Sequence, residues 1–262
     1  MKLNYYQVDA FTDAIFGGNP ACVVPLDEWL PDELLLKIAK ENAVPETAFF
    51  IPSGDAFELR WFTPEIEMDL CGHATLATAH VLKQHLSPES DNIIFQSKSG
   101  ELQVTIANEL YTMDFPSRMP ARVALPAIIQ ASLSIQPTET WLSRDYMLVY
   151  ESEQAIREIQ INRQVLDQVN LDPGGIIITA KGEQCDFVSR FFTPQASIFE
   201  DPVTGSSHCS LIPYWSKRLG KTKMIARQLS ERGGKLFCED KGDRVLIAGH
   251  ARTYSMGTLW TE

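Results

Sequence analysis

The sequence predicts a mixed α/β (α+β) fold of two pseudo-symmetric halves, each a curved β-sheet around one buried helix. Three observations support this prediction: a motif that recurs in mid-chain, strand-like segments in both halves, and one nearly all-apolar helix per half. The chain has 262 residues, and at roughly 150 residues per domain this length favours two domains or one large one.

The repeat is clearest in "RWFTP" at 60–64 and "RFFTP" at 190–194, an offset of 130. Three further pairs follow in the same order: "CGHAT" (71–75) with "PVTGS" (202–206), "SKSGEL" (97–102) with "SERGGKL" (230–236), and "NELYTM" (108–113) with "GDRVLI" (242–247). The offset grows to 134, as small loop insertions would make it grow. We therefore expect one half over residues 1–116 and another over 117–251. This pairing sets Cys71 opposite Pro202.

Apolar spacing and residue type predict the elements of each half. The first half should contain helices at 27–44 and 71–85 and strands at 47–51, 57–62, 101–106 and 110–115. The second should contain a helix at 205–219 and strands at 147–152, 175–180, 185–192, 235–240 and 244–249. Four prolines mark 116–140 as the expected linker. The helices at 71–85 and 205–219 are the two central helices, and the first is apolar nearly all round, as buried helices are.

Composition limits the function classes. The net charge is −11 and the pI about 5.0, which argues against a nucleic-acid partner because phosphates bind basic surfaces. The N-terminal residues lack the apolar core of a signal peptide, and no apolar run approaches the roughly 20 residues of a spanning helix. The five cysteines are widely spaced without a CxxC pair. We expect a reduced cytoplasmic protein with no membrane partner.

Each central helix follows a strand-to-helix turn, at 71–73 and at 201–206. A helix start offers unpaired N–H groups and a positive dipole end. Two such starts facing one cleft would hold a carboxylate substrate. The predicted substrate-binding residues of these turns are Gly72, Ala74, Thr204, Gly205 and Ser206. The alternative is that these residues only cap their helices.

Other chemistries are disfavoured by spacing. His73 and His80 are seven residues apart with no carboxylate between them, which is a weak metal signal, so we expect no metal. A hydrolytic triad of Asp201, Ser206 and His208 would draw on one short segment, without the GxSxG turn. Nucleotide-binding glycine motifs are absent from the sequence, so we expect no cofactor.

Five segments resemble the signatures of the phenazine-biosynthesis PhzF-like proteins: "FTDAIFGGNPACVV", "VPETAFF", "CGHATLATAH", "FFTP" and "EDPVTGSSH". The resemblance runs in order from near residue 8 to near residue 250. That family shares the fold of diaminopimelate epimerase. The resemblance therefore implies two halves, each a barrel-like sheet around a central helix, with the active site between them. It also implies that the C-terminal strand at 252–262 returns to the first half.

The same resemblance implies a catalytic glutamate at Glu46, with Asn19 contacting the substrate. His73 and Asp201 are the second catalytic candidates, since Asp201 could hold a substrate amine or hydroxyl and share a proton with His73. From its own surroundings Glu46 is equally compatible with an ordinary exposed carboxylate. A carboxyl group in apolar surroundings can take a proton from carbon and return it near neutral pH. The second half has no evident copy of Glu46.

We therefore predict a cofactor-independent biosynthetic isomerase that moves a proton between carbons of a small cyclic or unsaturated carboxylic acid, and we expect a homodimer. The epimerase relatives use one cysteine in each turn, but Pro202 stands opposite Cys71, which disfavours a two-thiol racemase. The alternatives are an amino-acid epimerase that uses Glu46 or Cys71, and a non-catalytic binding or scaffold protein of the same fold.

Overall fold

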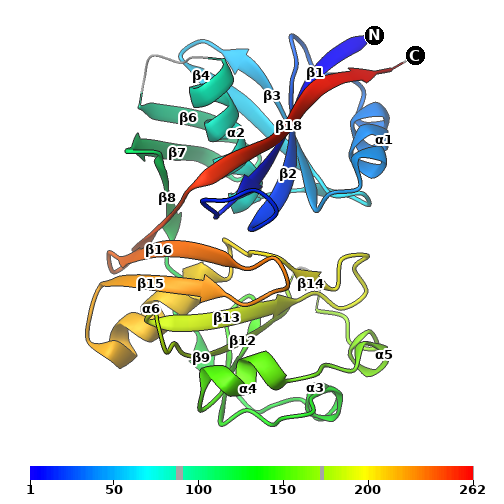
Figure 1. Ribbon diagram of the computed structural model, residues 1–262. Helices are drawn as coiled ribbons and strands as arrows, with labels where there is room; N and C mark the ends of the chain where they lie inside the picture. Colours follow the sequence, from blue (N-terminus) through cyan, green and yellow to red (C-terminus); the bar gives the residue numbers. More distant parts are fainter. Residues whose placement is uncertain (87–90, 172–173, 262) are drawn as a thin grey trace. The chain divides into compact units, whose positions relative to one another are not determined.

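The computed structural model describes residues 1–86, 91–171 and 174–261 (Figure 1). The chain forms two compact units: residues 1–114 with 248–262, and residues 115–247. Each unit is mixed α/β and has one long helix against its sheet. Among the described residues, no helix is long and apolar enough to cross a membrane.

The first unit is a strongly curved sheet that encloses one helix (Figure 1). Its strands are β1 (Lys2–Ala10), β2 (Asn19–Pro25), β3 (Glu46–Ser53), β4 (Ala56–Phe62), β5 (Glu67–Met68), β6 (Asn92–Ser97), β7 (Gly100–Ala107), β8 (Leu110–Pro116) and β18 (Ala251–Trp260). Pairing runs in the order β18, β1, β2, β3, β4, β6, β7, β8. Helix α2 (Gly72–His85) is buried from Gly72 to Leu82, whereas α1 (Asp32–Asn42) buries one face only.

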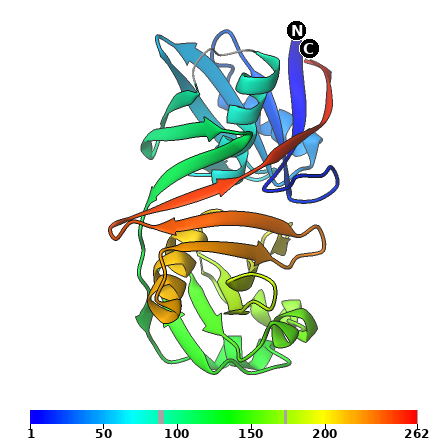
Figure 2. The same ribbon diagram turned by 60° about the vertical axis from the view of Figure 1, so that its left-hand side comes forward.

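The C-terminal strand closes the first unit against its N-terminal strand. β18 pairs antiparallel with β1, from Lys2 opposite Trp260 to Ala10 opposite Ala251. The two chain ends therefore lie side by side, as both ribbon views show (Figure 2). Residue 262 of the predicted strand lies outside the described residues.

The second unit repeats this plan. Its strands are β9 (Ala121–Arg122), β10 (Glu139–Leu142), β11 (Tyr146–Val149), β12 (Ile176–Lys181), β13 (Phe187–Phe192), β14 (Glu200–Asp201), β15 (Lys223–Gln228), β16 (Gly234–Asp240) and β17 (Arg244–Gly249). Pairing runs β9, β10, β11, β12, β13, β15, β16. Helix α6 (His208–Leu219) is buried from His208 to Ser216. The short helices α3 (Ala127–Ser132), α4 (Glu153–Glu158) and α5 (Arg163–Leu166) contribute to a separate apolar cluster.

Two sequence predictions need correction. The region 116–140 is not a linker: it contains α3, whose Ile129 is fully buried in the second unit. Its prolines misled the prediction because Pro126 stands directly before the first turn of α3, where proline is tolerated. The helix predicted over 27–44 is shorter, since Pro31 caps its start and Ala43 adopts a left-handed conformation at its end.

The internal repeat is visible as a matched pair of ionic contacts. Arg60 Nε and a terminal guanidinium nitrogen donate to both oxygens of Glu67, at 2.7 and 2.9 Å. Arg190 binds both oxygens of Glu200 at the same 2.7 and 2.9 Å. The two pairs occupy equivalent strand positions, because Phe62 faces Glu67 and Phe192 faces Glu200.

This register corrects the alignment of the turns. The arginines are 130 residues apart (190 minus 60), whereas the glutamates are 133 apart (200 minus 67), so the second copy carries a three-residue insertion in between. The pairing of Cys71 with Pro202 was therefore wrong: Cys71 corresponds to Thr204, and Gly72 to Gly205. The conclusion that the second turn lacks a thiol is unchanged.

Candidate functional site

Three of the predicted site residues, Asn19, Glu46 and His73, meet inside the first unit beside Cys71. His73 lies in the first turn of α2 and is 5% exposed in its side chain, and its Nε2 is 3.1 Å from Glu46 Oε2. On the other side of the ring, His73 Nδ1 is 3.3 Å from the Asn19 amide nitrogen and 3.5 Å from Cys71 Sγ. Glu46 is 16% exposed, so its carboxylate is mostly enclosed but reachable from solvent.

Local backbone geometry positions these side chains next to one another. Asn19 opens β2 directly after Gly18, which has a φ of +65° and whose added Cβ would lie 2.1 Å from the Ala10 carbonyl oxygen. Only glycine fits that conformation and that space. Glu46 opens β3, which pairs in parallel with β2. Two adjacent strands thus start with one polar side chain each, beside the start of α2.

The charges of this group are coupled. Burial opposes a charge on His73, but the Cys71 sulfur and the Glu46 carboxylate outweigh it and hold the pKa of His73 well above its ordinary value. We attribute the net rise to Glu46, because burial raises the pKa of the Cys71 thiol, which is therefore neutral at neutral pH. The retained proton belongs to the Glu46–His73 pair rather than to either residue alone.

The contact between Glu46 and His73 is close but not aligned. Although Glu46 Oε2 and His73 Nε2 are 3.1 Å apart, neither atom has a hydrogen-bond partner of good geometry among the described residues. Catalytic contacts are often misaligned before a substrate binds. Both atoms are buried, and each can still form a hydrogen bond.

Glu46, Cys71 and His73 also satisfy a simple proximity test for metal binding, since their ligand atoms lie within 4.8 Å of one another. The His73 ring separates the other two, with Nδ1 toward Cys71 and Nε2 toward Glu46. An ion on either nitrogen would therefore face one partner and turn away from the other. We assign no metal site here.

The remaining candidates lie in the second unit, where Asp201 and Thr204 form one braced turn. The Thr204 hydroxyl donates to Asp201 Oδ2 at 2.5 Å. Gln228, which is 1% exposed, accepts from the Thr204 backbone N–H at 2.9 Å and donates to the Asp201 carbonyl at 2.8 Å. Sequence reasoning missed Gln228, although a polar residue ending the buried face of an alternating strand (β15) is a usable signal.

The predicted backbone donors differ in availability. Thr204 N–H is already bound to Gln228, and Ala74 N–H is directed at the Cys71 sulfur. The cap residues of α2 and α6, Cys71 and Ser207, make no side-chain cap bond. Gly72 and the Gly205–Ser206 turn are the better candidates for binding an anion. Whether the two helix starts face one cleft stays a prediction.

The register of the repeat shows what the second unit has at each position of the first. Thr47 faces Phe62 and Ile176 faces Phe192, so Glu46 corresponds to Gly175. An added Cβ at Gly175 would lie 2.5 Å from the Phe191 ring. By the same reasoning Ser143 corresponds to Asn19, and Ser206 to His73. The Asn19–Glu46–His73 group therefore has no copy in the second unit.

Two other histidines are core residues. His80 contacts the Tyr111 and Thr253 hydroxyls, both at 3.0 Å, as expected for a core histidine. His208 Nδ1 is 2.9 Å from the Thr204 carbonyl oxygen, and burial lowers the pKa of His208 to about 4. Since Nδ1 binds the backbone and no contact with Asp201 is present among the described side chains, His208 does not complete a triad.

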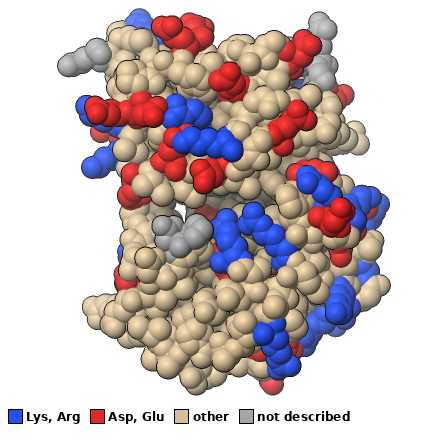
Figure 3. Space-filling view, turned by 180° about the vertical axis from the view of Figure 1, so that it is seen from behind, with Lys and Arg blue, Asp and Glu red and all other residues tan. Residues whose placement is uncertain are grey.

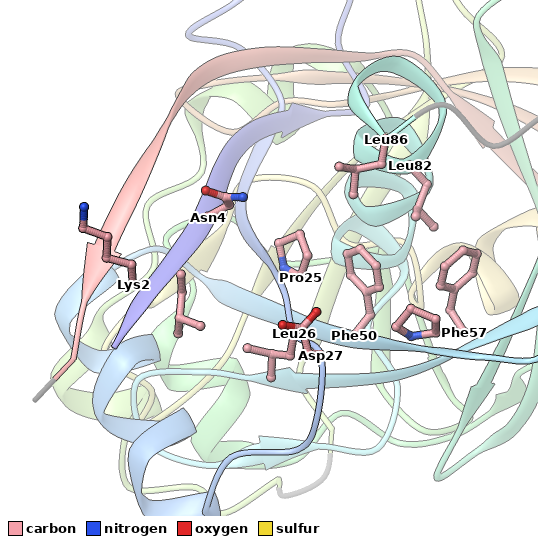
Figure 4. A pocket seen from close by; sticks show the side chains of 11 residues that line it. Lys2, Asn4, Pro25, Leu26, Asp27, Phe50, Phe57, Leu82 and Leu86 are labelled. Carbon is pink, nitrogen blue, oxygen red and sulfur yellow. The ribbon is translucent and has the colours of Figure 1, made fainter.

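A cavity of about 370 Å³ lies elsewhere in the first unit (Figure 4). Phe50, Phe57, Leu82 and Leu86 line its apolar part. Leu82 and Leu86 belong to the C-terminal end of α2, roughly 15 Å along the helix from His73 at 1.5 Å per residue. None of the predicted site residues lines this cavity, so we do not assign the chemistry to it.

The sequence was next compared with known proteins. The model of the PhzC-PhzF family, described as phenazine biosynthesis-like protein, matches residues 8–257. The chain belongs to this family. A PhzF family protein of Enterococcus faecalis has a crystal structure with 45% identity and a TM-score of 0.95, covering 100% of both chains. The predicted family and fold are thus confirmed.

Relatives within the PhzC-PhzF family support the enzyme class. A Pseudomonas aeruginosa protein named an uncharacterized isomerase is 46% identical over 260 residues, covering 99% of both chains. A hydroxyproline epimerase of Agrobacterium vitis, at 9% identity and a TM-score of 0.62, covers 98% of this chain and 92% of its own. The latter shows the shared fold alone. An isomerase is thus confirmed at the level of the family.

Proposed function

We propose that this PhzF-like chain is a cofactor-independent isomerase that moves a proton between carbons of a small carboxylic acid, with Glu46 as the acid/base. One observation carries the proposal: the enclosed Glu46 carboxylate lies 3.1 Å from His73 Nε2 and remains partly exposed. Glu46 would take the proton from carbon through its second oxygen, Oε1. The electron pair would stay on the substrate, and Glu46 would return the proton to another carbon.

The asymmetry of the repeat favours proton movement by one acid/base over a two-base epimerase. A two-base epimerase needs a proton carrier on each face of the reacting carbon. Gly175 and Thr204, the counterparts of Glu46 and Cys71, offer neither a carboxylate nor a thiol. The backbone N–H of Gly72 at the start of α2, and those of Gly205 and Ser206 in the second unit, are the proposed donors to a substrate carboxylate. Asp201 would hold a polar substrate group, since Gln228 and Thr204 fix its segment.

Glu46→Gln tests the assignment. Exchange of substrate C–H with solvent deuterium should be followed by mass spectrometry over a panel of cyclic, unsaturated and amino acids. Exchange should fall by roughly 10²–10⁴-fold, the contribution of general acid–base catalysis, because the amide cannot accept the proton. The matched control is Glu41→Gln, an exposed carboxylate at the end of α1, which should exchange at the wild-type rate.

Binding of a carboxylate distinguishes proton transfer by Glu46 from anion binding by the backbone N–H groups. A carboxylate that exchanges in the wild type should still bind the Glu46→Gln variant, because backbone N–H groups hold the anion. Exchange that persists in a folded Glu46→Gln variant would remove Glu46 from the mechanism.

A further inference from the structure

Asn19 is fully buried, with 0% of its surface exposed. The family resemblance implied that Asn19 contacts the substrate. In the structure its amide nitrogen instead lies 3.3 Å from His73 Nδ1, on the side of the ring away from Glu46. A side chain with no exposed surface acts through its neighbours, and His73 is the neighbour that carries chemistry.

The chemistry of an amide group fixes the direction of this hydrogen bond. An amide nitrogen donates and cannot accept, so Nδ1 of His73 must accept and cannot also carry a proton. The proton of the ring is then on Nε2, the nitrogen that faces Glu46 Oε2. Cys71 Sγ, 3.5 Å from the same Nδ1, is a weak S–H donor and favours the same arrangement.

This arrangement matters because the Glu46–His73 pair can hold two protons in two ways. Either the ring carries both, one on each nitrogen, beside a charged carboxylate, or the ring keeps one and Glu46 takes the other. Donation by Asn19 to Nδ1 opposes the first form, although the Glu46 carboxylate by itself favours a charge on the ring. A second proton taken from the substrate is then directed to Glu46 Oε1, from which it can return to carbon.

We propose that Asn19 is a positioning residue that keeps the His73 proton on Nε2 and so directs the second proton to Glu46. This inference rests on the proposed function, in which Glu46 is the acid/base. No atoms beyond the shared protons are involved: the substrate proton moves to Oε1 and back, while Nε2–H continues to face Oε2.

The second unit supports treating the three residues as one set. Ser143 stands at the position of Asn19, Gly175 at that of Glu46 and Ser206 at that of His73. Without a carboxylate and an imidazole there, no amide is needed to place a proton. All three members differ together.

Nitrogen-15 NMR of histidine-labelled protein tests the inference without a substrate, because imidazole nitrogen shifts report which nitrogen is protonated. The chain has five histidines, and the signal lost in His73→Gln assigns His73. Through the pH range in which the pair titrates, wild-type His73 should be protonated on Nε2 alone. A ring protonated on Nδ1, alone or together with Nε2, at neutral pH would overturn the proposal.

Two variants complete the test. Asn19→Asp replaces the donor by an acceptor, so Nδ1 should become protonated. Asn19→Leu removes the hydrogen bond at similar size, and Nδ1 protonation should then depend on pH. The other four histidine signals should be unchanged, which shows that the fold is kept. An unchanged His73 signal in folded Asn19→Asp would contradict the proposal.

Solvent exchange links the inference to activity. Asn19→Asp should slow exchange by roughly tenfold or more, but less than the loss of Glu46, which supplies about 10²–10⁴-fold. The two proposals can fail separately. If the wild type exchanges no acid of the panel, the proposed function fails, whereas the NMR result decides the role of Asn19 by itself.

Discussion

At the scale of single residues, Cys71 illustrates how position and reactivity can diverge. It stands at the start of α2, where a helix dipole would favour a thiolate. Its sulfur is nevertheless buried, and burial raises the pKa of the thiol. The sulfur lies 3.5 Å from His73 Nδ1, so we interpret Cys71 as part of the packing around the site.

Cys71→Ser should therefore retain most of the solvent exchange, because serine is similar in size and keeps a polar atom beside His73 Nδ1. Exchange rates of the purified variant check this, with Cys185→Ser, a half-buried cysteine in the second unit, as the control. A loss of about a thousandfold, the scale seen when a key catalytic group is removed, would favour a thiol mechanism instead.

Single residues also show how much of the candidate site the sequence alone could predict. The family motif located Glu46 and His73 because each stands in a short distinctive segment. The hydrogen bond of Asn19 to His73 spans 54 positions, and that of Gln228 to Thr204 spans 24. No spacing rule joins residues on separate parts of the fold, so these partners became visible only in the folded chain.

At the scale of elements, the strand pairs β4–β5 and β13–β14 carry the same arginine–glutamate contact. Both lie shortly before a functional turn, and both arginines also stack over an aromatic ring, Phe62 or Phe192. The contacts are bidentate and mostly shielded: side-chain exposure is 19% for Arg60 and 15% for Glu67. We interpret them as clamps that fix the approach to each central helix.

A double-mutant cycle on Arg60→Leu and Glu67→Gln should give a coupling free energy of unfolding of about 1–2 kcal/mol, as partly buried charge-assisted bonds do. Denaturant unfolding measures it. The exposed pair Lys241–Glu239 is the control and should give a coupling near zero to 0.5 kcal/mol. A clamp coupling no larger than that of the control would contradict this interpretation.

Element prediction failed where local signals were ambiguous. A repeat of "R-x-F-T-P" identified the two halves, yet the insertion between Pro194 and Glu200 shifted the alignment of the turns. Proline-rich segments also have two meanings. Around Pro126 the proline begins a helix instead of marking a linker, and only the burial of Ile129 distinguishes the two.

At the scale of the whole molecule, the distribution of surface charge favours solvation over the binding of a polyanion. The net charge is −11, and acidic and basic side chains are interspersed on the first unit in the view of Figure 3. Several cations are neutralised locally, as in Lys98–Glu67 and Lys83–Asp91. A small carboxylate fits this surface better than a nucleic acid, and a homodimer remains a proposal.

Stability should depend on pH through two buried histidines. Burial lowers the pKa of His80 and of His208 from 6.5 to about 4 each. The unfolded chain therefore binds more protons between these values. The contribution of these two histidines to the free energy of unfolding should be at its maximum above pH 6.5. It should fall as the pH drops toward 4, by up to about 3 kcal/mol per histidine.

Denaturant titrations at several pH values check this dependence. His208→Gln should flatten the fall between pH 6.5 and 4, whereas His250→Gln, a partly exposed histidine of the first unit, should leave it unchanged. Equal slopes in wild type and His208→Gln would show that His208 is not the source.

The glycine opposite Glu46 constrains how the two halves can be altered. A Cβ at Gly175 would lie 2.5 Å from the Phe191 ring and 2.8 Å from the Phe192 carbonyl oxygen, so a carboxylate added there would clash with both. A smaller residue at Phe191 would relieve only the first clash, so the β13 backbone would also have to shift. The difference between the two halves at this position is therefore hard to reverse. Engineering a two-base catalyst from this fold would have to begin with a redesign of the β12–β13 core.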